Sequence, residues 1–414
     1  MWSLLRRTTL TQWILVALVV GTLVGWAAPA LATTLRPLST VFLRMIKSII
    51  VPLVFGSLVV GIAGHGDDLK RVGRLAIKAL LYFEVVTTAA LAVGLLSVNL
   101  VRPGEGIRLP AAATPVVADG QPTFAGVLEH IVPQSVVAAA AENEVLQIVF
   151  WAVLFGLALS QVRGRPREVM VGFCEALAEV MFKVTAIVMR YAPIGIGAAV
   201  AVTVGQGGLG VLANLGKVVL TLYGALALFG VAVLLPVAWL ARVPLRRFLR
   251  AVKEPALIAF TTTSSEAALP TAMEHMEAIG VPRRIVAFVM PTGYSFNLDG
   301  STLYLAVASI FVAQAAGVAL SLGQQLLMMF TLMVTSKGVA GVPRASLVIL
   351  SGTLATFHLP LEAIAVLLGV DVVMDAARTT VNLVGNCLAA VVMARWEGEY
   401  PTNAAAVERS AEAA

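Results

Sequence analysis

Five polar side chains lie close together near the C-terminal end of this sequence, inside an otherwise apolar segment. Their spacings are four, three, four and four positions, and they are Asp371, Asp375, Arg378, Asn382 and Asn386. Residues three and four apart share one face of an α-helix, so the spacing predicts a polar helix face. An ionisable residue at the centre of a membrane helix costs at least about 2.5–3.5 kcal/mol. That face must therefore line a bundle interior or a cavity.

Two of these residues, one helical turn apart, have opposite charges. Arg378 offers a planar fork of donors that can hold a carboxylate in a bidentate manner. Asp375 can bind an ammonium group, so the pair suits a zwitterionic substrate with an additional carboxylate. Hydroxyls and a helix N-terminus around Ser264 and Ser265 could bind the remaining carboxylate. The alternative interpretation of Asp375 and Arg378 is an internal salt bridge that only stabilises the helix.

A second candidate site surrounds the run Asn297-Leu298-Asp299-Gly300-Ser301. Glycine permits an unwound turn there, which would expose backbone carbonyls. Asn297, Asp299 and Asn382, together with such carbonyls, form a hard oxygen set that suits Na⁺. Alternatively, a buried acid with a raised pKa could bind and release a proton.

Glu84 is the candidate proton carrier in the N-terminal half of the chain. It lies inside an apolar run, and Thr87 and Thr88 follow it, one turn further along a helix. The alternative is that Glu84 snorkels to the membrane interface near Lys78. We expect Glu84, Thr87 and Thr88 to take part in ion coupling.

The rest of the chain has the composition of a polytopic membrane protein. Of its 414 residues, 59% are hydrophobic and 13% are charged, against about 25% charged in a typical soluble domain. A membrane-spanning helix needs about 20 mostly apolar residues. The clear apolar runs are Trp13–Ala32, Val51–Ala63 (extended back to Val41), Ala76–Leu100, Val145–Leu159, Val180–Val204 and Leu215–Leu240.

Basic clusters separate alternate apolar runs, and an excess of Lys and Arg marks cytoplasmic loops. This pattern predicts a multi-pass protein of the cell (inner) membrane with both termini in the cytoplasm. It also explains the net charge of +6 without nucleic-acid binding. A cleaved signal peptide is the alternative for the first run, because Arg6 and Arg7 precede it and Ala30-Leu31-Ala32 resembles a cleavage site. An uncleaved helix fits better, since it preserves the alternation of basic loops.

Two segments of the last third predict re-entrant hairpins. Basic residues lie at both ends of Arg250–Arg283 and enclose the polar centre Thr261–Glu266. A single complete crossing would place basic clusters on both sides of the membrane, against the preference of Lys and Arg for cytoplasmic loops. The second segment is Ser336–Pro343. Paired broken segments of this kind indicate a transport site at the membrane midplane. We therefore divide the chain into an N-terminal six-helix region (1–247), a transport core (248–398) and a cytoplasmic tail (399–414).

Four ordered motifs support a family resemblance. They are Ser264-Ser265 before Ala268-Leu269-Pro270, the NLDGS run at 297–301, SKGVAGVP at 336–343 and DAARTTVNLVGN at 375–386. The sequence resembles the dicarboxylate/amino acid:cation symporters, the glutamate transporter family, and most closely the bacterial proton/glutamate-aspartate symporters. The resemblance implies an all-α membrane fold of eight transmembrane helices and two re-entrant hairpins, with inverted repeats. It also implies an elevator-type homotrimer in which helices 3 and 6 join the transport domain.

The resemblance also implies roles for individual residues. Arg378 would bind the side-chain carboxylate of the substrate, Asp375 its amino group, and Asn382 with the Ser264-Ser265 tip its main-chain carboxylate. The full substrate-binding set is Arg378, Asp375, Thr379, Asn382, Ser264, Ser265, Val339 and Gly341. The full ion-coupling set is Glu84, Asp299, Asn297, Asn386, Thr87, Thr88 and Ser336.

Departures from the sodium-coupled pattern of this family concern the ion. Sodium-coupled members have an aspartate where this chain has Asn386, and a tyrosine near the position of Glu84. These differences favour proton coupling, with sodium coupling as the alternative. C4-dicarboxylate members lack an acid at the position of Asp375, so its presence favours glutamate or aspartate over a dicarboxylate.

An intramembrane hydrolase that uses Ser264 or Ser265 is an alternative of a different class. It needs a base within hydrogen-bond reach, and the sequence has no His or Lys in a plausible neighbouring span. We therefore expect a transporter rather than an enzyme, with no resident cofactor. Its expected partners are an acidic amino acid, the lipid bilayer and two further copies of the chain.

Overall fold

The computed structural model describes residues 10–63, 69–106, 132–142, 144–208, 210–336, 345–357 and 359–400. In these ranges the chain is helical and forms no β-strand. The elements are α2 (Leu10–Ala27), α3 (Pro29–Thr34), α4 (Arg36–Ala63), α5 (Leu69–Val101), α7 (Val136–Glu142), α8 (Val145–Gln161), α9 (Arg165–Arg190), α10 (Ala192–Gly207), α11 (Gly210–Phe229), the π-helix η2 (Gly230–Leu234), α12 (Leu235–Leu240), α13 (Leu245–Thr262), α14 (Ser265–Ala278), α15 (Arg283–Phe296), α16 (Asp299–Ala315), α17 (Leu322–Thr335), α18 (Ala345–Thr356) and α19 (Glu362–Trp396).

Several of these helices are membrane spans by length and composition. In the described part of the chain, four stretches qualify, namely Arg74–Val101, Ala213–Leu240, Arg283–Ala315 and Val373–Trp396. The bent pair α9 and α10 would be a fifth. In the described part of the chain, this confirms the multi-pass membrane class predicted from composition and the all-helical structure that the family resemblance implies.

Proline divides two of the predicted apolar runs. Val180–Val204 is not one continuous helix, because the chain bends by 50° between α9 and α10. Pro193 stands in the first turn of α10, and its ring and missing N–H are incompatible with an uninterrupted helix. Likewise α2 stops at Ala27, just before Pro29 begins α3. These positions had been predicted as continuous helix from hydropathy alone.

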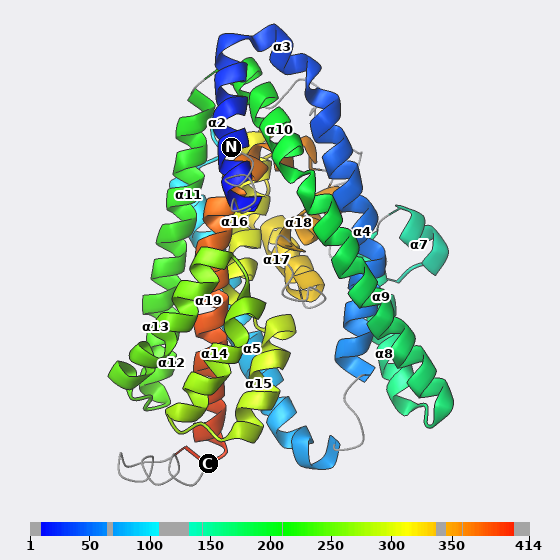
Figure 1. The fold of residues 1–414 in the computed structure, drawn as a ribbon, viewed down its shortest axis with the longest axis vertical. Helices are drawn as coiled ribbons and strands as arrows, with labels where there is room; N and C mark the ends of the chain where they lie inside the picture. The colour runs from blue at the N-terminus through cyan, green and yellow to red at the C-terminus, as the bar shows by residue number, and fades with distance from the viewer. Residues whose placement is uncertain are drawn as a thin grey trace, which may run out of the picture.

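The helices of the last third surround α19, which runs through the middle of the molecule next to α16 (Figure 1). Nearly every residue of α16 is buried. Helices α5, α11, α13 and α15 pack around this pair. Helices α4, α8 and α9 diverge on the other side (Figure 1), where they share a separate hydrophobic cluster around Val54, Leu58 and Val149. The polar residues of the last third are thus enclosed by helices from both halves of the sequence.

The segment predicted as the first hairpin contains α13 and α14, which pack against each other and are joined at Thr263 and Ser264. Thr263 adopts a left-handed conformation with φ of 52°, which is uncommon and strained for a residue other than glycine. The chain therefore breaks within the polar centre that the sequence indicated. Helices α17 and α18 pack together as the two arms of the second segment.

The unwound turn predicted in the run Asn297–Ser301 is present, but it lies at Asn297 and Leu298, just before Gly300. Both residues have non-helical backbone angles, whereas Gly300 lies inside α16. A Cβ on Gly300 would collide with the backbone carbonyl of Arg378. Glycine is required here for the close approach of α16 to α19 rather than for an unwound turn.

Candidate functional site

The predicted polar face of α19 is confirmed as a buried surface. Asp371 and Asn386 are fully buried, and Asp375, Arg378 and Asn382 are at most 6% exposed. Tight packing against α16 covers this face, because glycines stand at the contact. A Cβ on Gly385 would lie 2.5 Å from Asp299 Oδ2.

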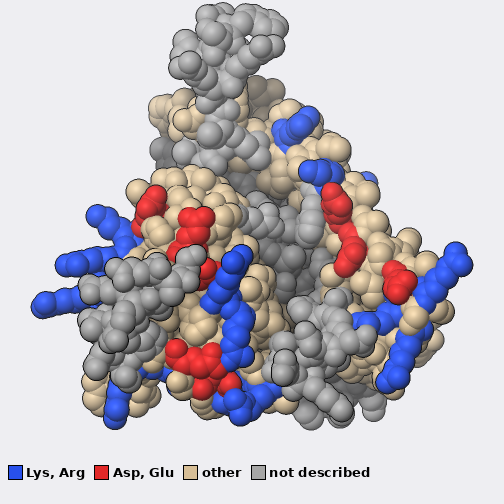
Figure 2. All heavy atoms as spheres, turned by 60° about the horizontal axis from the view of Figure 1, so that its bottom comes forward, with Lys and Arg blue, Asp and Glu red and all other residues tan. Residues whose placement is uncertain are grey.

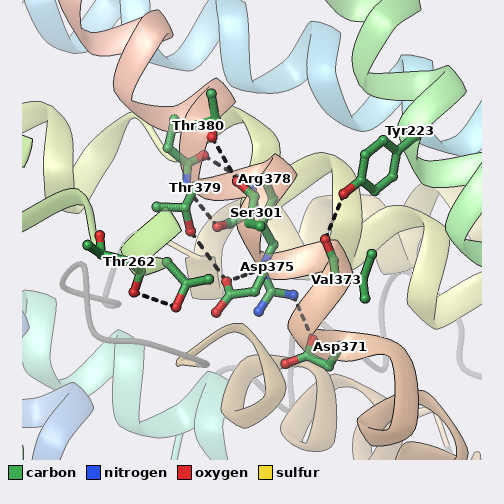
Figure 3. Close-up of polar contacts among 12 residues, drawn as sticks. Tyr223, Thr262, Ser301, Asp371, Val373, Asp375, Arg378, Thr379 and Thr380 are labelled. Carbon is green, nitrogen blue, oxygen red and sulfur yellow. Dashed lines mark hydrogen bonds and ion pairs between the residues drawn. The ribbon is translucent and has the colours of Figure 1, made fainter. Parts of the chain in front are cut away.

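Arg378 is the centre of a charged cluster (Figure 3). Its Nε donates to Asp375 Oδ1 at 2.7 Å, and its Nη1 donates to Asp371 Oδ1 at 2.9 Å. The guanidinium lies 4.2 Å from the centre of the Tyr304 ring. The remaining nitrogen, Nη2, is buried and has no acceptor within the described residues. Arg378 is thus held on three sides, and one donor stays available for a further carboxylate.

Two members of this cluster were not among the predicted site residues. Asp371 was placed on the polar face but was given no role. Its spacing of seven from Arg378, two helical turns on one face, was a usable signal. Tyr304 is fully buried in α16. An aromatic residue in an apolar run is typical of core packing, so its sequence context did not indicate the contact with Arg378.

Asn382 connects α19 to the start of α16. Its Oδ1 accepts from the backbone N–H of Ser301 at 3.1 Å, and its Nδ2 donates to Ser301 Oγ at 2.9 Å. Thr379 Oγ1 donates to Asp375 Oδ1 at 3.4 Å. In Figure 3, Ser301, Thr379 and Asp375 lie around Arg378.

The tip of the first hairpin presents hydroxyl groups at the start of α14. Ser264 caps this helix, since its Oγ accepts from Ala267 N at 3.2 Å, as expected of an N-cap serine. Ser265 is buried, and its carbonyl accepts from Tyr294 Oη at 3.0 Å. Thr262, at the other side of the tip, lies in the same close-up as Arg378 (Figure 3). Tyr294 is a tip-positioning residue that the sequence did not single out.

The predicted ion-coupling residues at the α15–α16 break, at the start of α16 and on α19 come together. Asn297 Nδ2 donates to Asn386 Oδ1 at 3.1 Å, and both side chains are fully buried with Asp299. Asn297 Oδ1 and Asn386 Nδ2 have no hydrogen-bond partner in the described part of the chain. Tyr82 on α5, a residue outside the prediction, lies within electrostatic reach of Asp299. Asn297 Oδ1 and the Asp299 carboxylate are thus the buried oxygens of this cluster whose chemistry suits a cation, either Na⁺ or a proton.

Glu84 lies on α5, the helix that packs along α16. Its side chain is half-buried, Thr87 is buried, and Thr88 is exposed. Thr88 Oγ1 donates to the Glu84 carbonyl at 2.7 Å. Lys78, named as a snorkelling partner, instead has its Nζ 2.6 Å from Glu397 Oε1, at the end of α19. Glu84 lies six residues after Lys78 in the sequence, about 9 Å further along α5.

The second hairpin is only partly described. Ser336 is buried at the end of α17, and its Oγ donates to the Met333 carbonyl at 3.1 Å. Val339 and Gly341, both predicted to close over the substrate, lie outside the described residues.

A membrane-embedded helical bundle with a buried charged site between broken helices defines a secondary transporter. Comparison with known proteins agrees with this class. Residues 10–396 match the Sodium:dicarboxylate symporter family, and the chain belongs to that family.

Three relatives show the range of named activities. The chain is 41% identical to the proton/sodium-glutamate symport protein of Geobacillus stearothermophilus, over 96% of each protein. It is 43% identical to the proton/glutamate-aspartate symporter of Escherichia coli (strain K12), over 95% of this chain and 94% of the relative. It is 42% identical to the C4-dicarboxylate transport protein of Rhizobium johnstonii, over 94% and 89%. Overall identity therefore does not separate amino acid from dicarboxylate transport.

Proposed function

We propose that this chain is a secondary active symporter that imports glutamate or aspartate together with protons. The observation that supports this most strongly is the buried cluster of Asp371, Asp375 and Arg378. Relatives named as proton/glutamate-aspartate symporters support the same substrate and ion.

The charge of this cluster favours an amino acid over a dicarboxylate. Counted as ionised, its two carboxylates and one guanidinium leave one net negative charge. A dicarboxylate would bring only further negative charge to it, whereas an acidic amino acid also brings an ammonium group. Asp375 would bind that ammonium, while Arg378 Nη2 would donate to the substrate's side-chain carboxylate. C4-dicarboxylate transport remains the second candidate because a relative of that name is equally similar.

The net negative charge of this cluster also favours symport with a cation. An acidic amino acid has a net charge of −1, so its entry adds negative charge to a negative buried site. A co-bound cation reduces this cost. We assign the proton to Glu84 or Asp299, because Asn386 supplies a neutral amide beside Asp299 and Asn297. Sodium at Asn297, Asp299 and Asn382 is the alternative, favoured by the open Oδ1 of Asn297 and by relatives named proton/sodium-glutamate symporters.

The finer architecture is part of the proposal. We assign eight transmembrane helices, two re-entrant hairpins formed by α13–α14 and α17–α18, and inverted repeats. We further propose elevator-type movement of residues 248–398 with helices 3 and 6, a homotrimer in the cell inner membrane, and cytoplasmic termini. The antiparallel arms of α13–α14, which meet at a strained polar tip, support the hairpin assignment.

Uptake by reconstituted protein tests the proposal. Liposomes containing the protein should accumulate labelled glutamate or aspartate when the outside is made acidic in sodium-free buffer. Excess unlabelled aspartate should compete, and excess succinate should not. Uptake that needs sodium and ignores the pH gradient would contradict proton coupling, and transport of succinate without glutamate would contradict the substrate assignment.

A further inference from the structure

The outer face of α13 has two chemically different halves. Exposed basic side chains occupy its first part, at Arg246, Arg250 and Lys253. Exposed apolar side chains follow on the same face, with Leu257 61% exposed and Phe260 44% exposed. The spacings of three and four residues place all five on one side of the helix.

The opposite face of α13 is already used for packing. Phe248, Val252 and Ala259 are buried where the helix contacts α14 and α19. The outer face is thus directed away from the body of the chain. In Figure 1, α12 and α13 lie at the edge opposite α8 and α9. Figure 2 shows basic side chains projecting from that same edge.

Among the described residues, Arg246, Arg250 and Lys253 form no ion pair, although Glu254 lies one turn from Arg250 on the same helix. Arg247, by contrast, donates to the Ala278 carbonyl. The exposed Glu254 faces His275, at 3.7 Å between Oε2 and Nε2. The cations extend over about 10 Å of helix. The exposed Trp239 lies at the end of α12, the helix that precedes α13 in the chain.

We propose that this face of α13 binds an anionic phospholipid. The phosphate of the lipid lies on Arg246, Arg250 and Lys253, and its acyl chains lie along Leu257 and Phe260. A basic segment directly beside a membrane helix attracts anionic headgroups, and a helix with a basic half and an apolar half matches both parts of such a lipid. Free phosphate would use only the basic half. The C-terminal end of α13 is the substrate-site tip, so the bound lipid touches the first arm of that hairpin.

Quenching of Trp239 by brominated lipids tests this inference. The Trp239 signal is the difference between the unsubstituted protein and Trp239→Phe, each reconstituted in phosphatidylcholine vesicles. Brominated phosphatidylglycerol should bind near Trp239 more tightly than brominated phosphatidylcholine, by about five-fold for each basic residue engaged. Arg246→Gln with Arg250→Gln should bring the two lipids close to equality, and the single Lys253→Gln should give a smaller decrease.

A matched charge-removing control is Arg163→Gln with Arg165→Gln at the start of α9, where both side chains are exposed. This control should leave the lipid preference unchanged. Equal quenching by both lipids in the unsubstituted protein would overturn the inference. An equal loss of preference in the control would also overturn it, because that would indicate a general surface potential. Displacement of the lipid by millimolar glycerol phosphate would overturn it as well, because that would indicate a site for the headgroup anion alone. The readout is independent of transport, so its failure would leave the proposed function intact.

Discussion

The charged cluster around Arg378 and the amide cluster around Asn386 lie on the same helix face but differ in how their polar atoms are satisfied. Arg378 donates to two carboxylates and stacks on an aromatic ring. Asn297 and Asn386 share one hydrogen bond, and each leaves one buried polar atom without a partner in the described part of the chain. Since buried polar groups are rarely left unsatisfied, the unpartnered Asn297 Oδ1 supports our proposal that an ion binds at the amide cluster. We propose that the charged cluster instead selects the substrate by its net charge.

The largest effect is expected from Arg378→Ala, which removes the cation from between two buried acids. Truncating one partner of a buried, hydrogen-bonded charge pair costs about 2–5 kcal/mol of binding free energy, so glutamate uptake should decrease by at least about 30-fold. Arg190→Ala, an exposed position at the end of α9, is the control and should retain uptake. If Arg378→Ala elutes normally by size exclusion and still transports glutamate, Arg378 is not the carboxylate-binding residue.

Asp375→Asn should change which substrate is accepted. The substitution removes the ammonium partner and makes the cluster neutral, so glutamate uptake should decrease by about ten-fold or more. Inhibition of the remaining uptake by succinate should increase, because a neutral cluster no longer repels a dicarboxylate. Competition assays with unlabelled succinate and unlabelled glutamate measure the ratio of the two inhibitions. An unchanged ratio would show that Asp375 acts only as the helix-stabilising partner of Arg378.

Asn386→Asp should alter the coupling ion rather than the substrate. A second carboxylate beside Asp299 would be repelled by it, and a bound cation would relieve that repulsion. Uptake should become dependent on sodium, with a stimulation of about ten-fold, while the preference for glutamate over succinate stays constant. Asn99→Asp, the same change on α5 at a half-buried position, should produce no sodium dependence.

The smallest effect is expected outside both clusters, at the end of α19. Hydrogen bonds from Lys78 and then Arg74 hold the pKa of the Glu397 carboxyl below its ordinary value. A lowered pKa stabilises the folded protein above the ordinary carboxyl pKa, and this contribution is lost as the pH falls through the folded value. Acidification below about pH 5 should therefore lower the Tm of the unsubstituted protein more than that of Glu397→Gln. Glu105→Gln, at an exposed pair with Arg102, should behave like the unsubstituted protein.

The sequence predicted the elements of the site better than their contacts. Helical periodicity was sufficient to place Asp371, Asp375 and Arg378 on one buried face, because membrane burial of charge leaves few alternatives. It did not show that Arg378 would bind both acids, since side-chain pairing depends on rotamers. Tyr304 and Tyr82 were missed because an aromatic residue in an apolar run has the same pattern whether it fills a core or contacts a charge.

Hydropathy was least informative where glycine or proline determines the path or the packing of a helix. Pro193 bends a run that composition alone predicts to be continuous. The turn predicted within Asn297–Ser301 lies at Asn297 and Leu298, but Gly300, interpreted as its cause, is instead the contact point between α16 and α19. Both errors arise because a residue's effect on the backbone depends on what lies opposite it, and the sequence does not contain that information.

The most direct test of the account is whether glutamate brings a proton with it. Liposomes containing the protein and an internal pH-sensitive dye, in sodium-free buffer without an initial gradient, should acidify inside when glutamate is added outside. Addition of succinate should cause no acidification. Accumulation of labelled glutamate with no change in internal pH, or acidification by succinate alone, would contradict the account.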